Sequence, residues 1–304
     1  MNYAAMLVLV GLACLALLLL AVHILFRVPR RVEQGSPADH GIDYEEVHLR
    51  AVDGKRLFAW WLPAEDAAPA IVVLHGWGGN AEYMLPLALP LHKAGLNILL
   101  LDARNHGRSE AAAFSSLPRF AEDAGVAVDW VKATSRDPGR RVALLGHSVG
   151  AGAVLLEASR RNDISALISI AAFAHPAWMM RRYLDRFRIP GFLQTGINRY
   201  VEWVIGYRFD DIAPRNTVCR IRCPVLLVHG TADRTVPIGD AEAIRDRCRH
   251  NPPELLRIEG GDHDSVDRIE HNADRLIAFL KNAGFIDAAS GRSRDQDGRS
   301  SRKQ

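Results

Sequence analysis

Six short apolar runs recur along the chain, and stretches of helical character separate them. Each run has the length and the β-branched composition of a strand that is buried on both faces. The runs lie near 70–74, 97–101, 141–145, 164–170, 224–229 and 254–258. The helical stretches lie near 80–94, 119–134, 149–160, 239–249 and 265–282. Strands that alternate with helices in this way predict a doubly wound, mostly parallel sheet.

An antiparallel hairpin is expected before the first of these runs. Tyr44 to Leu49 and Lys55 to Leu62 flank Asp53-Gly54, which is a strong turn signal. With these two strands the expected sheet has eight. We expect one α/β domain over 43–285, a polar linker over 32–42 and a disordered polar tail over 286–304, which is rich in Ser, Arg, Asp and Gly.

A sharp corner is predicted where the run 141–145 meets the following helical stretch. The corner reads Gly146-His147-Ser148-Val149-Gly150, which has the G-x-S-x-G pattern of a nucleophile elbow. Glycines on both sides allow a tight turn and leave the Ser148 hydroxyl accessible. A serine hydroxyl needs a base to remove its proton, and the base needs an acid to orient it.

Candidates for this base and acid follow in the chain. Asp233 comes just past the strand 224–229, and His263 comes just past the strand 254–258. Residues at the carboxyl ends of parallel strands gather at one edge of the sheet. The neighbours Asp262 and Asp264 compete for the role of the acid, but adjacent residues point in different directions from the histidine. No carboxylate follows the strand 164–170 directly, so Asp233 is the predicted acid.

A fourth element is a loop of small residues after the strand 70–74. It reads His75-Gly76-Trp77-Gly78-Gly79 and can aim a backbone N–H at a developing oxyanion. The N–H of the residue after the serine would be the second donor. Trp77 and Val149 are therefore the predicted oxyanion donors. Four other histidines near strand ends are expected to pack in loops or to support the site, namely His75, His106, His147 and His229.

With these parts in order, the chain resembles an α/β-hydrolase of the serine type from Asp43 to Gly284. Leu101 to Ser109 is similar to the D-x-R-G-H-G-x-S segment of lipases, esterases and aminopeptidase-like members, with Asn105 in place of the usual glycine. The membrane-anchored, Bem46-like or serine-aminopeptidase-like subgroup is the most similar. The resemblance implies the α/β-hydrolase fold and an α-helical cap inserted at about 174–215.

The expected cap is rich in aromatic residues and arginine. One interpretation is a helical cap whose apolar side packs on the core while its arginines face water. The other is a cap that lines an acyl-binding pocket and touches anionic lipid headgroups. The residues concerned are Trp178, Met179, Met180, Tyr183, Phe187, Phe192, Tyr200, Trp203 and Tyr207, interleaved with Arg181, Arg182, Arg186, Arg188 and Arg199.

The first 31 residues are predicted to form a transmembrane anchor and its basic flank. Tyr3 to Phe26 has no charged residue and is long enough to cross a bilayer as a helix. A cleaved signal peptide is the alternative, but no basic residue precedes the run and no clear cleavage site follows it. Arg27, Arg30 and Arg31 follow the run and predict a cytoplasmic catalytic domain.

Other classes of function find little support in the sequence. Cys219 and Cys223 lack a second pair of metal ligands, so buried thiols are expected, and the three cysteines outside the anchor suit a reducing compartment. No phosphate-binding glycine motif follows a strand. The net charge of +3 is spread over mixed acids and bases, which argues against a nucleic-acid binder. Neither a metal nor a cofactor is expected.

These observations predict a membrane-anchored serine hydrolase that cleaves the acyl ester bonds of lipid-like or small esters through a Ser-Asp-His triad and an acyl-enzyme intermediate. Two alternatives stay open. One is a serine peptidase of the aminopeptidase or prolyl type, for which the cap offers Asp185, Glu202, Asp210 and Asp211 as partners for a substrate amine. The other is a non-catalytic, membrane-tethered binding protein that has kept the fold.

Overall fold

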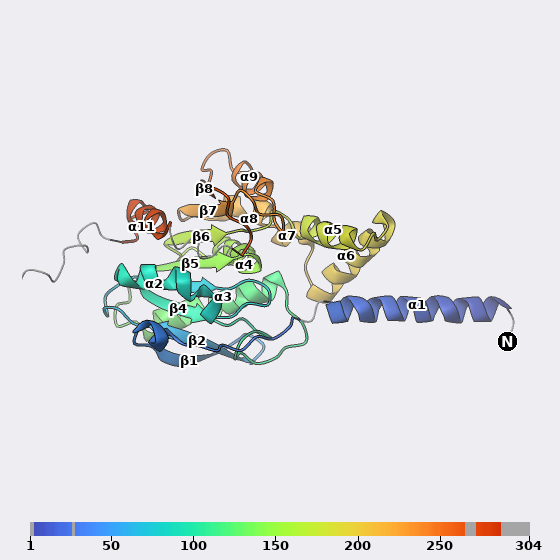
Figure 1. The fold of residues 1–304 in the computed structure, drawn as a ribbon, viewed down its shortest axis with the longest axis horizontal. Helices are drawn as coiled ribbons and strands as arrows, with labels where there is room; N and C mark the ends of the chain where they lie inside the picture. Colours follow the sequence, from blue (N-terminus) through green and yellow to red (C-terminus); the bar gives the residue numbers. More distant parts are fainter. Residues whose placement is uncertain (1–2, 26–27, 265–271, 287–304) are drawn as a thin grey trace, which may run out of the picture.

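An eight-stranded sheet crosses the body of the protein in the order β1-β2-β4-β3-β5-β6-β7-β8 (Figure 1). The first two strands pair antiparallel, as does β2 with β4, and every later pair is parallel. The predicted doubly wound, mostly parallel sheet is therefore confirmed. Its strands are β1 (Glu45–Arg50), β2 (Arg56–Leu62), β3 (Ala70–Leu74), β4 (Asn97–Leu101), β5 (Val142–His147), β6 (Ala166–Ile170), β7 (Val225–Gly230) and β8 (Glu254–Ile258).

The computed structural model describes residues 3–25, 28–264 and 272–286. The predicted polar tail beyond residue 286 and the first part of the last predicted helix, residues 265–271, lie outside the described residues.

Successive side chains along each central strand point to opposite faces of the sheet, which divides the core into two layers. Ile71 and Val73 of β3 pack on one side of the sheet, against α2 (Leu85–Lys93) and α11 (Ala273–Asn282). Val72 and Leu74 pack on the other side. The helices there are α3 (Leu117–Thr134), α4 (Val149–Ala158) and α9 (Gly239–Arg245). Because both faces are covered, the central strands are continuous apolar runs.

The helical elements between β6 and β7 are α5 (Pro176–Arg186), α6 (Gly191–Ile205), α7 (Phe209–Ile212), α8 (Pro214–Thr217) and the 3-10 turn η3 (Val218–Arg220). Helices α5 and α6 stand out from the sheet at one end of the molecule, whereas α8 lies in the body beside α4 and α9 (Figure 1). We call α5 and α6 with their connection the cap. Met180, Leu184 and Ile197 bury the inner side of the cap against the core. Arg182 of α5 forms a bidentate ion pair with the buried carboxylate of Asp240 in α9, which fastens the cap to the body.

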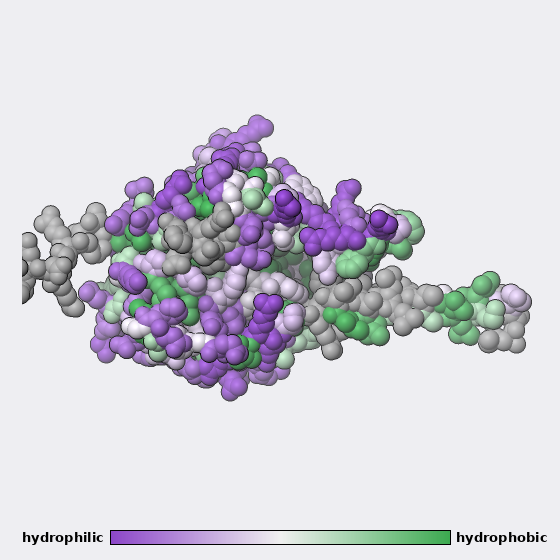
Figure 2. Space-filling model, in the orientation of Figure 1, coloured by the Kyte–Doolittle hydropathy of each residue, from purple (hydrophilic) through white to green (hydrophobic). Residues whose placement is uncertain are grey.

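The outer side of the cap carries aromatic side chains that are exposed to water. Trp203 is 78 % exposed, Phe192 is 76 % exposed and Phe187 is 58 % exposed. Figure 2 shows hydrophobic colour at the outer end of the cap, whereas the visible face of the body is largely hydrophilic. The interpretation in which the apolar side of the cap packs on the core therefore holds only for the inner side of the cap.

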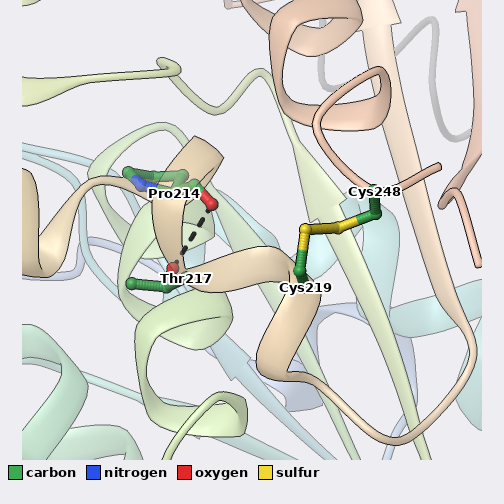
Figure 3. The surroundings of a disulfide bond; sticks show 4 residues. All are labelled: Pro214, Thr217, Cys219 and Cys248. Carbon is green, nitrogen blue, oxygen red and sulfur yellow. Dashed lines mark hydrogen bonds between the residues drawn. A yellow bond between two sulfur atoms is a disulfide. The ribbon is translucent and has the colours of Figure 1, made fainter. Parts of the chain in front are cut away.

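A disulfide corrects one prediction from the sequence. Cys219 in η3 is bonded to Cys248 in the loop after α9, with the two Cα atoms 5.3 Å apart (Figure 3). The expectation of a buried thiol was wrong for Cys219, because the fold places a cysteine 29 residues away next to it. Cys223 is a free, buried thiol, as predicted. The pairing also removes the argument that the cysteine pattern indicates a reducing compartment.

Helix α1 (Tyr3–Leu25) projects away from the body at the end that carries the cap (Figure 1). Within the part of the chain that the structure describes, no helix combines the length and the apolar character needed to cross a membrane.

The segment 28–36, which we call the strap, lies on the loops that follow β3 and β4. Gln34 and Gly35 donate their backbone N–H groups to the Glu82 carboxylate, at 2.7 and 3.0 Å. Arg30 donates to the carbonyl oxygen of Ser109, and the Asn80 amide donates to the carbonyl oxygen of Arg31 at 3.3 Å. The short helical turns η1 (Pro37–His40) and η2 (Glu82–Met84) border this segment.

Candidate active site

Ser148 lies at the corner between β5 and α4 in a strained conformation. Its φ of 55° and ψ of −118° are rarely adopted by residues other than glycine. The corner follows from β5 ending at His147 and α4 beginning at Val149 with no connecting residue except the serine. The predicted strand–turn–helix context of the G-x-S-x-G pattern is therefore present.

Both glycines of the pattern are required by close backbone contacts. A Cβ atom at Gly146 would stand 2.4 Å from the carbonyl oxygen of Gly150. A Cβ atom at Gly150 would stand 2.3 Å from the carbonyl oxygen of His75 in the loop after β3. Any larger residue at either position would push the corner away from the neighbouring loop.

Asp233 lies beyond β7 with its carboxylate buried. Its Oδ1 atom accepts hydrogen bonds from the N–H groups of Thr235 at 2.9 Å and Val236 at 2.8 Å. Its Oδ2 atom lies 2.8 Å from Nδ1 of His263. Burial alone would raise the pKa of Asp233, but the adjacent His229 and hydrogen bonds from His263 and Val236 outweigh it and hold the pKa well below its ordinary value. Asp233 is thus a carboxylate.

His263 lies beyond β8 and connects the acid with the serine. Its Nε2 atom is 3.0 Å from Oγ of Ser148, while its Nδ1 atom faces Asp233. The structure brings together all three residues that the sequence selected, from three strand ends of one sheet. Of the competing acids, Asp264 instead directs Oδ1 toward the Tyr83 hydroxyl, at 3.5 Å.

The loop after β3 packs closely on the serine. A Cβ atom at Gly76 would lie 3.1 Å from Cβ of Ser148, and Gly79 closes a turn by donating its N–H to the carbonyl oxygen of Gly76 at 3.1 Å. This turn holds Trp77 next to the elbow. Val149 is the first residue of α4, where helix geometry leaves the backbone N–H without a partner within the helix. The two predicted oxyanion donors thus belong to segments that meet at Ser148.

His75 and His106 are buried behind this loop. Nε2 of His75 accepts the N–H of Ala103 at 3.1 Å, so its Nδ1 carries the proton and donates to the carbonyl oxygen of Gly76 at 2.7 Å. The two imidazole rings lie 4.8 Å apart, and the His106 ring lies 6.1 Å from the ring of Trp77. Burial lowers the pKa of His75 to about 3 and that of His106 to about 4. Both rings are neutral packing elements.

Two other histidines touch the candidate triad. His229 lies 3.5 Å from Oδ2 of Asp233 and donates from Nε2 to the carbonyl oxygen of Val236 at 2.7 Å. Nε2 of His147 lies 2.9 Å from the carbonyl oxygen of His263. The sequence predicted that both residues lie near the site. It could not identify their partners, because every residue has a backbone carbonyl group.

The segment after β4 forms a tight loop around Asp102. The Asp102 carboxylate accepts the N–H groups of Ala81 and Arg108, both at 2.8 Å. Burial, followed by the nearby Glu33 carboxylate, raises the pKa of Asp102 well above its usual range. Gly107 must be glycine, because a Cβ atom there would stand 1.9 Å from this carboxylate.

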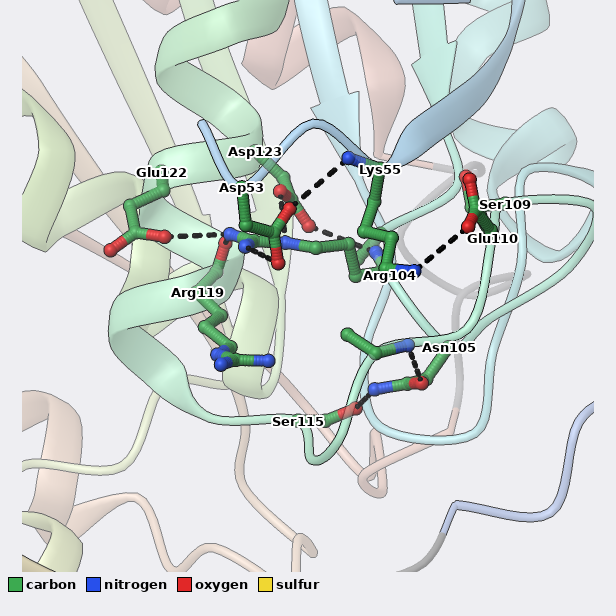
Figure 4. Close-up of polar contacts among 12 residues, drawn as sticks. Asp53, Lys55, Arg104, Asn105, Ser109, Glu110, Ser115, Arg119, Glu122 and Asp123 are labelled. Atoms are coloured by element: carbon green, nitrogen blue, oxygen red, sulfur yellow. Dashed lines mark hydrogen bonds and ion pairs between the residues drawn. The ribbon is translucent and has the colours of Figure 1, made fainter. Parts of the chain in front are cut away.

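Asn105 has a left-handed conformation with a φ of 70°. Asparagine is the residue after glycine that adopts it most readily, because its short amide can hydrogen-bond locally. Here the amide donates to Oγ of Ser115 at 2.9 Å, while its oxygen accepts the N–H of Ala112 at 2.7 Å (Figure 4). The exchange of the usual glycine for Asn105 therefore keeps the turn and adds two bonds.

Arg104 is buried in a cluster of three carboxylates (Figure 4). Its guanidinium lies 3.0 Å from Asp53, 2.7 Å from Glu122 and 2.7 Å from Asp123. Asp53 comes from the β1–β2 turn, and the other two come from α3. The arginine therefore ties the hairpin and α3 to the loop after β4.

Among the described residues no group of three or more histidine, cysteine or carboxylate side chains could hold a metal ion.

Comparison with known proteins places these features in context. Residues 65–206 match the family model described as serine aminopeptidase, S33. The uncharacterized protein YfhR of Escherichia coli is 29 % identical over 252 residues, covering 79 % of this chain and 81 % of that protein. The α/β hydrolase domain-containing protein WAV2 of Arabidopsis thaliana is 27 % identical over 232 residues, covering 74 % of this chain and 73 % of its own length.

Solved structures share the fold. The esterase Pf2001 of Pyrococcus furiosus superimposes with a TM-score of 0.67 at 23 % identity, covering 84 % of this chain and 97 % of that one. Est1E of Butyrivibrio proteoclasticus, solved with ferulic acid, gives a TM-score of 0.62 at 22 % identity, covering 76 % of this chain and 98 % of that one.

Proposed function

We propose that this chain is a serine hydrolase of the α/β-hydrolase superfamily and that it cleaves acyl esters through Ser148, His263 and Asp233. The observation that carries the proposal is the continuous contact from the Asp233 carboxylate through both nitrogens of His263 to the Ser148 hydroxyl, at 2.8 and 3.0 Å. Nucleophile, base and orienting acid are thereby within hydrogen-bond reach of one another.

The chemistry follows from this geometry. Nε2 of His263 takes the proton of Ser148 as Oγ attacks the ester carbonyl carbon. The N–H groups of Trp77 and Val149 stabilise the oxyanion. The tetrahedral intermediate then expels the alcohol, which receives the proton from His263. Water attacks the acyl-enzyme in the same way and releases the acid, which restores Ser148. Apart from the ester and water, every group that these steps need comes from the chain itself.

A lipid-like acyl ester is the proposed substrate. The support comes from the aromatic cap over the active-site end of the sheet and from the apolar N-terminal segment. The structural neighbour Pf2001 is an esterase, which points to the same bond type.

A peptidase is the second candidate, because the matching family model is described as a serine aminopeptidase. Three of the four cap carboxylates that could receive a substrate amine are engaged with other groups, which favours the ester. Asp185 accepts from Gln194 at 2.7 Å, Glu202 pairs with Arg199 and Arg208 at 3.4 Å each, and Asp210 contacts His175 at 2.9 Å.

The decisive experiment combines a fluorophosphonate probe with a substrate panel. The probe should label the wild type and leave Ser148→Ala unlabelled, while Ser159→Ala, at the far end of α4, should be labelled like the wild type. Turnover of p-nitrophenyl esters from acetate to palmitate and of aminoacyl amides then separates the candidates. Cleavage of the amides alone would replace the esterase proposal by the peptidase. An unlabelled wild type would leave the non-catalytic binding protein.

Attachment to a membrane through the N-terminal segment is a further part of the proposal, and it rests mainly on the uncharged sequence of residues 3–26. The side chains of Leu9, Leu12 and Ile24 in α1 are each more than half exposed, and a bilayer would remove them from water. The exposed Phe187 and Phe192 with the neighbouring Arg186 and Arg188 suit contact with an anionic lipid surface.

Two features of the chain point to opposite sides of the membrane for the catalytic domain. Arg27, Arg30 and Arg31 favour a cytoplasmic catalytic domain, which we propose. The Cys219–Cys248 disulfide is typical of oxidising compartments and speaks for the opposite side. Labelling of intact cells with an impermeant thiol reagent, after reduction, decides between them. Protection until the cells are opened supports the proposal, and labelling of Cys219 or Cys248 from outside overturns it.

A further inference from the structure

The loop that carries His263 is fastened on one side to the loop that carries Asp233. The Ala232 N–H donates to the carbonyl oxygen of Gly261 at 2.9 Å, and the Gly260 N–H donates to Oγ1 of Thr231 at 2.9 Å. These bonds keep base and acid together. They do not determine how far the imidazole lies from the nucleophile, which belongs to β5.

His147 supplies a contact from the nucleophile side. Its Nε2 atom lies 2.9 Å from the backbone carbonyl oxygen of His263, and the two imidazole rings lie 5.3 Å apart. A carbonyl oxygen only accepts, so Nε2 of His147 carries the proton and donates it. Burial lowers the pKa of His147 to about 4, which keeps the ring neutral with one proton to donate.

The His147 ring has little freedom to move. It is 3 % exposed, and a Cβ atom at Gly76 would stand only 3.1 Å from its Nδ1 atom. On another side the ring of Tyr83 lies 6.0 Å away. The Tyr83 hydroxyl itself donates to the backbone carbonyl oxygen of Asp264 at 3.3 Å. Two side chains therefore hold the consecutive carbonyl groups of residues 263 and 264.

We propose that His147 is a positioning residue that sets the distance between His263 and Ser148, with Tyr83 supporting the next carbonyl group. His147 and Ser148 are adjacent on the same backbone, so the element that presents the nucleophile also holds the base at its main chain. The inference rests on the proposed function, because the distance matters for proton transfer from Ser148. A misplacement of about 1 Å at such a distance costs about 100-fold in rate.

The test compares His147→Phe, which keeps a ring without a donor, with His147→Gln, whose amide can reach the same carbonyl. We expect His147→Phe to lower kcat on a p-nitrophenyl ester by about 100-fold with little change in KM. We expect His147→Gln to recover most of that loss. His92→Phe is the matched control: its Nε2 also contacts a carbonyl oxygen, that of Pro63 at 2.9 Å, but at the opposite end of the sheet, so kcat should be unchanged.

Hydrogen exchange of the peptide spanning residues 259–264 gives a second readout that needs no turnover. Exchange should rise in His147→Phe and stay near the wild-type rate in His147→Gln. Equal kcat and equal exchange for His147→Phe and the wild type would overturn the proposal. So would a His147→Gln protein as impaired as His147→Phe at the same melting temperature, since that would show that a donor to this carbonyl group does not restore the rate. A wild type without labelling or turnover refutes the proposed function instead, and the exchange data still decide the positioning role.

Discussion

A disulfide joins Cys219, in the turn η3 that precedes β7, to Cys248, in the loop after α9. The bond closes a loop across a sequence separation of 29 residues that contains β7 and Asp233. It therefore restricts the unfolded chain around the segment that supplies the candidate acid.

Loss of this bond should lower the free energy of unfolding by about 2 to 4 kcal/mol, because the unfolded chain regains the freedom of a loop of this length. Cys219→Ser with Cys248→Ser, measured by urea unfolding, should match the wild type treated with reductant. Cys223→Ala is the control, since Cys223 is a free thiol and its replacement should leave the response to reductant intact. A wild type that is indifferent to reductant would contradict a stabilising role for the bond.

Asp233→Asn should lower kcat by about 10,000-fold while the protein remains folded, because the amide no longer stabilises the charged imidazole and favours the wrong tautomer of His263. Circular dichroism tests whether the variant remains folded, and ester hydrolysis measures the loss of kcat. Asp262→Asn serves as the comparison and should retain turnover. If Asp233→Asn kept full activity, the role of the acid would pass to Asp262 or Asp264.

Asn105→Ala should lower the free energy of unfolding by about 1 to 3 kcal/mol, through the strain of a left-handed alanine and the loss of the bonds to Ser115 and Ala112. Asn105→Gly keeps the conformation and loses only the bonds, so it should be less destabilised. Urea unfolding of both variants separates the strain of the left-handed alanine from the loss of the two hydrogen bonds. The account of this turn fails if alanine is tolerated as well as glycine.

Stability should fall as the pH drops from about 6.5 toward about 4, because three histidines are buried neutral. Burial lowers the pKa of His75 to about 3 and those of His106 and His147 to about 4, from the ordinary value of 6.5. The unfolded chain therefore binds these protons first. The stabilisation is complete above the unfolded value and is lost as the pH falls through the folded one.

Each such histidine contributes up to about 1.4 kcal/mol per pH unit to this slope. His106→Phe should therefore have a shallower pH dependence of the free energy of unfolding than the wild type between these limits. An unchanged slope would show that His106 is protonated in the folded protein.

The sequence was sufficient for the parts of the fold that follow from local patterns. Buried strands read as apolar runs, and Ser148, Asp233 and His263 could be selected because each follows such a run. The contacts at 2.8 and 3.0 Å are then possible because the carboxyl ends of these parallel strands lie at one edge of the sheet. Helix α9 ends at Arg245, before the predicted residue 249, where the chain turns toward the disulfide.

Features that depend on tertiary proximity could not be read in this way. The partner of Cys219 lies on an element whose position only the folded sheet determines. The roles of His147 and His229 depend on backbone carbonyl groups, which every residue possesses. The outward aromatic side chains of the cap, Phe192 and Trp203, resemble core residues in composition, and only their exposure sets them apart.

The strap has a consequence for how the protein can be shortened. Removal of α1 alone would leave the bonds from Gln34 and Gly35 to Glu82 in place. A cut after residue 36 would instead strip the contacts to Asn80 and Ser109, and would remove Val28, whose side chain lies 3.9 Å from the position of a Cβ atom at Gly78. A soluble version meant to keep its turnover should therefore begin at or before residue 28, although the domain itself was expected to start only at residue 43.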